Sequence, residues 1–400
     1  MSAGSTARLP GETTIGMLGG GQLGRMFAFA AQRLGYRVHV FSPQASSPAG
    51  RVADREWFAP FEDRDALREF AKTVDVVTLE FENIPADSLR ELERRVPVRP
   101  GPNVLETSQH RRREKTTLAD AGFPVADFVC VTSLEELQRV APGRLPAVLK
   151  STAWGYDGKG QVRLDAAEQI EAAWHTLACE EAILEALIDF ECELSVIAAR
   201  SESGEVVSYE PFHNVHANHI LDVSVSPSGL PPAVCEEAQQ LARSILEQLQ
   251  VVGVMCVEMF LTRNGELLVN ELAPRPHNSG HLTIEAHVTS QFEQQVRAVC
   301  GLPLGSTQPR SPAAMANLLG DLWHPVPPDF VRVLQRPATY LHLYGKGEPK
   351  PGRKMGHITA LAEDGPTAVT RVRDARSELG VGAAGPPRAM LHETTGRDLA

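Results

Sequence analysis

The sequence lacks several features that define whole classes of protein. Its six cysteines are scattered and form no C-x-x-C pair, which excludes a dense disulfide framework or a cysteine zinc knuckle. No stretch of about eighteen apolar residues occurs, and the first residues are small and polar, so we expect neither a membrane span nor export. A net charge of −11 argues against a general nucleic-acid-binding protein. We therefore expect a cytoplasmic protein with reduced cysteines and no membrane or nucleic-acid partner.

What is present is an ordinary globular composition, 42% apolar and 22% charged over 400 residues, which is enough for two or three domains. Residues 13–19 predict a short buried strand, and Gly19, Gly21 and Gly24 match G-x-G-x-x-G at the start of a predicted helix over 22–34. A nicotinamide enzyme also needs an acid after the second strand, but that strand ends in Ser42 and Pro43. The glycine pattern alone therefore does not establish a dinucleotide site.

The elements up to about residue 105 predict one open, mostly parallel sheet flanked by helices. Strands are expected at 56–59, 74–81 and 98–100, with helices at 63–72 and 85–94. Glu80-Phe-Glu-Asn83 lies at the carboxyl end of a strand, the edge where open α/β sheets bind ligands. Either glutamate could instead cap the helix that follows, and the sequence leaves both roles open.

The strongest chemical signal lies between residues 254 and 281. Two apolar runs flank Asn264-Gly265, a pair typical of a two-residue hairpin turn, and this turn places Glu258 directly opposite Glu271. Facing carboxylates among apolar neighbours repel, so either both reach water or they share a divalent cation. The next turn adds four polar side chains: Arg275, His277, Asn278 and His281. We therefore favour a metal site that serves oxyanions.

A second signal begins at Lys150, which ends a predicted apolar strand and needs an anionic partner or a route to water. Residues 151–161 follow, S-T-A-W-G-Y-D-G-K-G-Q, where glycines leave backbone amides free to approach a polyphosphate. The segment is not a Walker loop, because the G-K-[ST] ending is absent and 161–164 predicts a returning strand. A flexible hairpin turn is the alternative interpretation.

Weaker signals occur elsewhere in the chain. Glu193 follows Glu191 by two residues on a predicted strand, and one of them could accept hydrogen bonds from a ribose. Histidines 213, 216 and 219 are spaced so that they face different sides, which argues against a three-histidine metal site. The basic run 111–113 on a predicted helix over 107–121 is typical of a solvated face. The loop 346–357 carries four cations and suggests a phosphate monoester ligand, with a solvated loop as the alternative.

Taken together, G-Y-D-G-K-G-Q, the segment 184–193 and V-N-E-L-A-P-R-P-H-N-S-G-H resemble the ATP-grasp superfamily. Within it, the chain looks like the 5-(carboxyamino)imidazole ribonucleotide synthases of de novo purine biosynthesis. The likeness extends from G-G-G-Q-L-G-R at Gly19 to P-G-R-K-M-G-H ending at His357. Two positions depart from the family pattern: Trp154 stands where a second glycine usually precedes G-Y-D-G, and His110 stands where an acid is common.

The resemblance implies the site residue by residue. The ATP-binding positions would be Arg111, Lys150, Gly155, Tyr156, Asp157, Gly158, Lys159, Gly160, Gln161, Glu185, Ala186, Leu187, Ile188, Glu193, His216, Asn270 and Glu271. Magnesium, with manganese as the alternative ion, would bind Glu258 and Glu271. The catalytic positions would be Asp157, Lys159, Arg275, His277 and Asn278. The ribonucleotide would contact Gln22, Glu80, Tyr156, Asp157, Lys159, His277, Lys346 and Arg353.

The resemblance also implies an α/β and α+β multidomain fold, in which a Rossmann-like open sheet precedes a two-lobed ATP-grasp unit and a small C-terminal β-rich domain. The expected ranges are a disordered 1–12, an N-terminal domain at 13–106, the ATP-grasp domain at 107–310, and the C-terminal domain at 311–365. The ATP-grasp lobes would divide near 190, into about 122–190 and 191–310. Residues 366–400 would be a weakly structured tail or the end of the last domain. A homodimer is implied.

The implied reaction is ATP-dependent carboxylation of 5-aminoimidazole ribonucleotide with bicarbonate, through carboxyphosphate or the carbon dioxide it releases. Three alternatives stay open at this point. Another ATP-grasp ligase, such as a formate-dependent glycinamide ribonucleotide transformylase, shares the N-terminal loop and the carboxylate hairpin. A nicotinamide oxidoreductase would use the glycine pattern but lacks the second-strand acid. A catalytically silent nucleotide-binding regulator would not need both carboxylates, Lys150 and Arg275.

Overall fold

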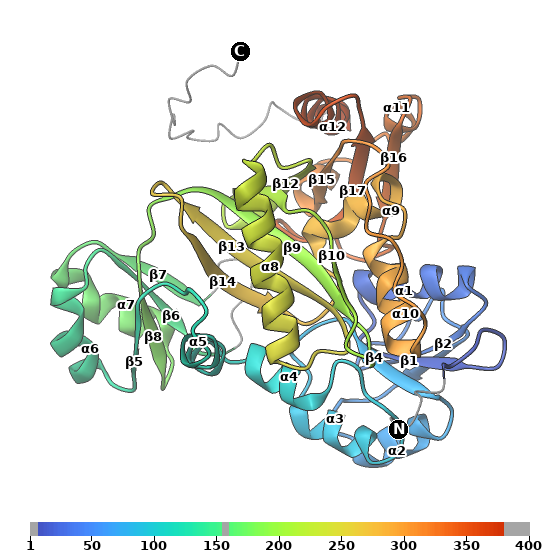
Figure 1. Cartoon of the computed structure of the whole chain (residues 1–400), viewed down its shortest axis with the longest axis horizontal. Helices are drawn as coiled ribbons and strands as arrows, with labels where there is room; N and C mark the ends of the chain where they lie inside the picture. Colours follow the sequence, from blue (N-terminus) through green and yellow to red (C-terminus); the bar gives the residue numbers. More distant parts are fainter. Residues whose placement is uncertain (1–6, 154–159, 380–400) are drawn as a thin grey trace.

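Four parallel strands form the first sheet of the computed structural model, which describes residues 7–153 and 160–379 (Figure 1). Their order is β3-β2-β1-β4. The strands are β1 (Thr14–Leu18), β2 (Arg37–Ser42), β3 (Arg55–Phe58) and β4 (Val76–Leu79), and the helices around them are α1 (Gln22–Arg33), α2 (Arg64–Ala71) and α3 (Ala86–Glu93). The predicted open parallel sheet is therefore confirmed.

Helices cover both faces of this sheet, which explains why every residue of β1 is buried. On one face, Ile15 and Met17 pack with Phe27 of α1. On the other face, Val77 and Leu79 of β4 pack with residues of α2 and α3. The carboxyl ends of β1 and β4 are thereby held side by side, and the glycine-rich turn and Glu80 follow them directly.

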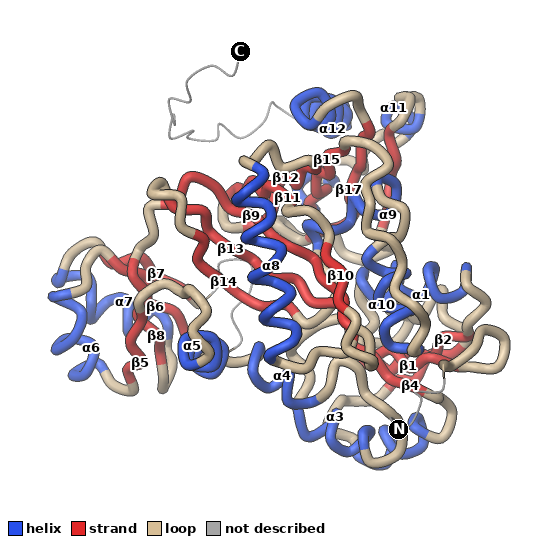
Figure 2. Tube along the Cα trace, in the orientation of Figure 1, coloured by secondary structure: helices blue, strands red, loops and turns tan. Residues whose placement is uncertain are grey.

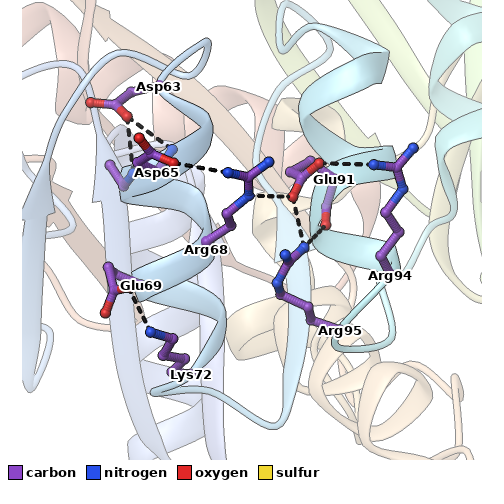
Figure 3. Close-up of polar contacts among 9 residues, drawn as sticks. Asp63, Asp65, Arg68, Glu69, Lys72, Glu91, Arg94 and Arg95 are labelled. Atoms are coloured by element: carbon purple, nitrogen blue, oxygen red, sulfur yellow. Dashed lines mark hydrogen bonds and ion pairs between the residues drawn. The ribbon is translucent and has the colours of Figure 1, made fainter.

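A buried carboxylate joins α2 to α3 (Figure 3). Glu91 of α3 accepts hydrogen bonds from Arg68 of α2 at 2.9 Å, from Arg94 at 3.1 Å and from Arg95 at 2.7 Å. The Arg68 hydrogen bond contributes most to lowering the pKa of Glu91, so the carboxylate stays ionised. This contact holds together the helix pair that packs under β4.

The second sheet belongs to a separate lobe, seen at the left of Figure 1. Its strands are antiparallel in the order β5-β8-β6-β7. They are β5 (Phe128–Val131), β6 (Ala147–Ser151), β7 (Gln161–Leu164) and β8 (Ala182–Ala186), and they pack with α6 (Leu134–Val140), η1 (Ala141–Gly143), η2 (Ala167–Gln169) and α7 (Ile170–Leu177). The predicted returning strand over 161–164 is confirmed.

Two helices lead into this lobe, α4 (Pro102–Ser108) and α5 (Arg111–Asp120). The prediction of one helix over 107–121 is therefore wrong at its start. His110 has an extended backbone with φ −134° and ψ 107°, and the Gln109 side chain donates to the carbonyls of Glu82 and Ile84. These contacts to the N-terminal domain break the helix and redirect α5 toward the large sheet.

The third sheet is the largest and runs β14-β13-β9-β11-β12-β15-β17-β16, with β10 paired to β9 (Figure 2). The strands of its first half are β9 (Phe190–Arg200), β10 (Val206–Ser208), β11 (Phe212–Ala217), β12 (Ile220–Ser226), β13 (Gly253–Thr262) and β14 (Leu267–Ala273). Helix α8 (Pro232–Gln248) covers one face of this half, where Ala238, Ala242 and Ile245 pack with β9, β13 and β14. The other face is left to η3 (Asn278–Leu282), α9 (Thr283–Ala286), α10 (Gln291–Cys300) and the candidate site.

The C-terminal strands β15 (Ala313–Leu319), β16 (Thr339–Leu343) and β17 (Lys354–Leu361) continue the same sheet, because β15 pairs with β12. They carry η4 (Gly320–Trp323), α11 (Val331–Leu334) and α12 (Gly365–Leu379). Helix α12 buries Ala368, Val372 and Ala375 against these strands. Of the two alternatives given for residues 366–400, the described part, 366–379, agrees with the end of the last domain, because it lies in α12.

Within the two described ranges, no helix combines the length and the apolar character that crossing a bilayer requires.

Candidate active site

The hairpin β13–β14 pairs Glu258 with Glu271, as predicted, but its turn and its register differ from the predicted ones. The turn contains three residues, 263–265, because the Thr262 amide donates to the Glu266 carbonyl, and Gly265 has φ +84°. Pairs near the turn, such as Met259 with Val269, are consequently one residue out of the predicted register. A β-bulge then adds one residue to β14 and restores the Glu258–Glu271 pair.

The bulge also explains why two consecutive residues face the same side of the sheet. Val269 and Leu272 belong to the core cluster under α8, although strict alternation would put them on opposite faces. The two residues between them, Asn270 and Glu271, therefore both lie on the face away from α8. This face also carries Glu258, because cross-strand partners share a face.

The paired carboxylates are electrostatically strained. Burial, followed by the charge of Glu271, raises the pKa of Glu258 to about 8. His277 lies beside it, with Nε2 3.2 Å from Oε1 of Glu258. A cation placed between Glu258 and Glu271 would relieve this repulsion, so the residues present fit a hard divalent ion.

Cys256 lies two residues before Glu258 on β13, and its sulfur belongs to a set with Glu258 and His277 whose ligand atoms lie within 4.8 Å of one another. Burial raises the pKa of Cys256 well above its ordinary value, so the thiol stays protonated. A protonated thiol is a poor ligand, which leaves the two carboxylates as the better donor pair.

The opposite end of the site is cationic. Lys150, at the end of β6, donates to Glu185 of β8 at 2.8 Å, so the anionic partner predicted for Lys150 is Glu185. Lys115 of α5 lies 3.8 Å from the same carboxylate oxygen and donates to the Val269 carbonyl at 3.1 Å. The charges of Lys115 and Lys150 outweigh burial and lower the pKa of Glu185.

Sequence reasoning missed Lys115 and its neighbour Glu114. Glu114 accepts from the Leu272 amide at 3.1 Å, so both side chains of α5 bind the backbone of β14 on either side of the bulge. Burial raises the pKa of Glu114 to about 8. One sequence signal was available. Leu118 lies three residues after Lys115 and is buried in the core under α8, so the spacing of the two residues marks this side of α5 as facing inward.

Glu193 of β9 and His216 of β11 form a pair, with Oε2 and Nδ1 2.6 Å apart. Burial acts to lower the pKa of His216, but the hydrogen bond and charge of Glu193 outweigh it and raise the pKa. Both were predicted to contact the nucleotide, and the structure brings them together on the site side of the sheet. His213 and His219 take other positions, as their spacing predicted.

The segment after β14 brings Arg275 against the N-terminal domain, where its guanidinium lies 2.7 Å from Glu82. That contact raises the pKa of Arg275 despite burial. Asn278 is buried, and neither polar atom of its side chain has a hydrogen-bond partner among the described residues. A buried amide without partners fits a ligand contact, since such groups otherwise cost free energy.

Glu80 receives the amides of the glycine-rich turn. Its Oε2 accepts from Gly24 at 2.7 Å, and its Oε1 accepts from Gly21. Burial raises its pKa. The first turn of α1 is therefore already bound by a side chain of the protein, which argues against the pyrophosphate of a dinucleotide at this place. The alternative in which Glu80 caps the helix after β4 is wrong, because it binds the start of α1.

The last predicted group lies between the N-terminal and C-terminal domains. Lys346 donates to Gln22 at 2.6 Å, which joins two predicted ribonucleotide contacts from distant parts of the chain. Arg51 donates to the Gly345 carbonyl at 2.9 Å and adds a cation that sequence reasoning did not select. Arg353 donates to the Glu348 carbonyl at 2.9 Å, within its own loop.

Several predicted residues belong to the glycine-rich loop. Gly160 and Gln161 are described: Gly160 has φ +70°, its carbonyl accepts from the Ser151 amide at 2.8 Å, and Gln161 pairs with Lys150. Arg111 donates to the Ser151 carbonyl at 2.7 Å at the other side of this hairpin. Five predicted positions lie outside the described residues: Gly155, Tyr156, Asp157, Gly158 and Lys159.

Three family models cover this architecture in order. Residues 12–109 match the ribonucleotide synthetase preATP-grasp domain, residues 116–292 the ATP-grasp domain, and residues 313–371 the phosphoribosylaminoimidazole carboxylase C-terminal domain. The N5-carboxyaminoimidazole ribonucleotide synthase of Bacillus subtilis is 46% identical over 350 residues, which is 87% of this chain and 91% of the relative. The chain belongs to the N5-carboxyaminoimidazole ribonucleotide synthase family.

Other members of the synthase family agree. The Brucella melitensis synthase is 44% identical over 89% of this chain and 98% of its own length. The Thermus thermophilus synthetase structure has a TM-score of 0.84 at 41% identity, covering 91% of this chain and 98% of its own. The structure of the Aspergillus clavatus synthase, solved with ADP and 5-aminoimidazole ribonucleotide, has a TM-score of 0.85 at 33% identity. It covers 92% of this chain and 98% of its own. The predicted family, fold class and ATP-grasp ligase assignment are confirmed.

Proposed function

We propose that this chain carboxylates 5-aminoimidazole ribonucleotide with bicarbonate and ATP, giving N5-carboxyaminoimidazole ribonucleotide, ADP and phosphate. Family membership supports the reaction, and the relative solved with ADP and 5-aminoimidazole ribonucleotide supports the substrates. Bicarbonate is a poor electrophile because its leaving group is hydroxide. Transfer of the γ-phosphoryl group to a bicarbonate oxygen replaces that leaving group with phosphate. The amine nitrogen then attacks the activated carbon.

The observation that carries the proposal is the Glu258–Glu271 pair on one face of the hairpin. The pKa of Glu258, raised to about 8 by burial first and by the charge of Glu271 second, supports this assignment. We assign Glu258 and Glu271 to magnesium, with manganese as the alternative ion. When bound, the cation neutralises phosphate charge during transfer.

The chain's own residues then have separable tasks. Lys150, placed by its bond to Glu185, would bind nucleotide phosphate, and Asn270 faces the same side as the metal pair. Arg275, oriented by Glu82, would hold the oxygen of the bicarbonate-derived group. Asn278 would offer it a buried amide. Asp157 would accept the proton that the attacking amine releases.

At the other end of the ribonucleotide, Lys346 and Gln22 would bind its phosphate, with Arg51 as an additional cation nearby. We further propose a homodimer, a cytoplasmic location and the domain divisions given above, with the last domain extended to residue 379. The formate-dependent alternative would require the same nucleotide end but a different acceptor.

The test is ADP release by the parent enzyme with each cosubstrate omitted in turn, together with transfer of ¹³C-bicarbonate label into the ribonucleotide. Full activity should require ATP, a divalent cation, bicarbonate and 5-aminoimidazole ribonucleotide. Turnover with formate and glycinamide ribonucleotide instead would replace the proposal with the transformylase alternative. Absence of labelled product under all conditions would reject the carboxylation.

A further inference from the structure

A row of buried polar side chains crosses the large sheet behind His277. Ser224 of β12 donates to Oδ1 of Asn214 on β11 at 2.7 Å, and Nδ2 of Asn214 donates to Ser195 of β9 at 2.9 Å. Ser195 donates to Oγ of Ser279 in η3 at 2.7 Å. All four residues are at most 4% exposed, so water cannot replace these hydrogen bonds.

The strand pairing assembles this row. Ser224 is the cross-strand partner of Asn214, and Ser195 is the cross-strand partner of Glu258. Ser224, Asn214 and Ser195, with Glu258 beyond them, therefore follow neighbouring strands in the order β12, β11, β9 and β13, and Ser279 joins them from η3. Their function as a unit depends on the register of the sheet, and none of their sequence positions are adjacent.

The row ends on one nitrogen of His277. Nδ1 of His277 lies 2.9 Å from Oγ of Ser279 and 3.3 Å from the Ser279 backbone nitrogen. A backbone N–H can only donate, so Nδ1 must accept. Ser279 already receives the Ser195 proton, and its other side-chain neighbour, Cys256, is a protonated thiol that can donate to Ser279, so the hydroxyl proton of Ser279 is free to point at Nδ1. The ring proton of a neutral His277 is consequently on Nε2, which faces Glu258.

We propose that Ser224, Asn214, Ser195 and Ser279 form a positioning relay that holds His277 as the Nε2–H tautomer, so that His277 donates a hydrogen bond at the reaction centre instead of accepting a proton there. The place where this donor acts rests on the proposed function, because His277 lies beside the assigned metal ligand Glu258. The tautomer itself is a property of the protein alone. Glu258 can receive the His277 proton on one oxygen and face a cation with the other.

The relay assigns hydrogen-bond donation and proton acceptance at the site to different residues. With Nδ1 bound by two donors and Nε2 protonated, His277 has no lone pair available for the proton of the attacking amine. In the substrate complex, the single Nε2–H would be shared between Glu258 and a carboxylate oxygen of the bicarbonate-derived group, where negative charge is present throughout the reaction. Proton acceptance then falls to another residue, in agreement with the role proposed for Asp157.

Ser195→Ala breaks the relay one residue behind the group that contacts His277. The matched control is Ser226→Ala, since Ser226 is a fully buried serine on β12 two residues from Ser224 and donates to Glu210, outside the relay. Ser279→Ala is the second variant, for use if Ser195→Ala does not fold, because it removes the last hydroxyl and keeps the backbone donor. Far-ultraviolet circular dichroism verifies folding in each case.

The first readout is the two-bond ¹H–¹⁵N spectrum of ¹⁵N-histidine-labelled protein without substrates, with the His277 signals assigned by their loss in His277→Asn. The parent and Ser226→Ala should show the Nε2–H tautomer, and Ser195→Ala should show a mixture of tautomers. The second readout is steady-state kinetics. In Ser195→Ala, kcat should fall about 10- to 100-fold, the scale of a misplaced catalytic group, while KM for ATP stays within about twofold.

An imidazolium or an Nδ1–H ring in the parent overturns the proposal, and so does a parent-like ring signal or a parent-like kcat in Ser195→Ala. Failure of the proposed function gives a different result. In that case the tautomer and its response to Ser195→Ala remain, but the parent shows no bicarbonate-dependent ADP release.

Discussion

Glu185 is buried and Glu258 is partly buried, and their surroundings shift the pKa values of these two glutamates in opposite directions. Glu185, in the small lobe, lies between Lys150 and Lys115, and these charges lower its pKa despite burial. Glu258, in the large lobe, faces Glu271 and has a pKa raised to about 8. The small-lobe end therefore carries its own counterions, whereas the large-lobe end would need the proposed cation. Replacing a charge should cost stability at the first end and activity at the second.

The largest effect is expected for Lys115→Met, which removes a fully buried cation from Glu185 and from the Val269 carbonyl. Leaving a buried charge incompletely paired costs about 3 to 5 kcal/mol, so the urea denaturation midpoint should fall markedly. Lys72→Met is the control, since Lys72 makes an exposed ion pair with Glu69. Equal midpoints for Lys115→Met and the parent would mean that Lys150 alone neutralises Glu185.

Glu271→Gln should show the opposite pattern. We expect kcat/KM to fall about 100- to 1,000-fold, because one oxygen ligand of the cation loses its charge. The same change removes repulsion from Glu258, so the protein without ligands should unfold at a higher temperature at pH 8.5. Glu266→Gln is the control, an exposed glutamate on the same hairpin beyond the turn. Retained activity in Glu271→Gln would remove this residue from the metal site.

The carboxylates with raised pKa values should make the stability of the protein depend on pH. Glu258 and Glu114 have folded pKa values of about 8, above the value of about 4.3 for unfolded glutamate. Between these values the folded state binds more protons than the unfolded chain, so their contribution to stability is lost as the pH rises toward 8. The melting temperature without ligands should decline from pH 6 to pH 8.5.

Magnesium with ADP should counteract that decline most strongly at the highest pH values, because the cation replaces protons on the carboxylates. Thermal scans across this pH range, with and without magnesium and ADP, measure both effects. In Glu258→Gln the decline should be smaller than in the parent. A melting temperature that rises with pH in the parent would contradict the assigned direction of both shifts.

The smallest effect is expected where the two lobes meet at the surface. Arg263 in the hairpin turn and Asp189 after β8 form an ion pair at 3.0 Å, with side chains 54% and 81% exposed. Exposed pairs contribute little because water screens them. Arg263→Gln should leave both the melting temperature and kcat/KM unchanged, and a clear loss of either would mean that the lobe contact matters for closure around the nucleotide.

Local patterns predicted much of the fold. Apolar runs and turn residues correctly indicated the parallel sheet and the returning strand at 161–164. They also paired Glu258 with Glu271, although by a two-residue turn that the structure does not have. The roles of the individual site residues stay predictions, because they rest on resemblance.

Residues that act through distant partners were not predictable in this way. The local sequence R-R-R-E-K is typical of a solvated face, and only the spacing to Leu118 indicates otherwise; Lys115 is buried because α5 packs on the edge strand β14. Ser195 and Asn214 read as ordinary strand residues until the order of β9, β11 and β12 is known. Likewise, the break at His110 depends on contacts that Gln109 makes with the N-terminal domain. Sequence spacing reports which face a side chain takes, but not which element will cover it.

The extra residue in β14 also constrains how this hairpin can change. With a two-residue turn at Asn264-Gly265 the ribbon would need no bulge: Glu258 would still pair with Glu271, but Met259 would pair with Asn270 instead of Val269. Because Met259 belongs to the core under α8, Asn270 would then face that core, and the ribbon could no longer present an amide and a carboxylate from adjacent positions. The length of the turn and the set of side chains that the hairpin presents on this face therefore cannot change independently.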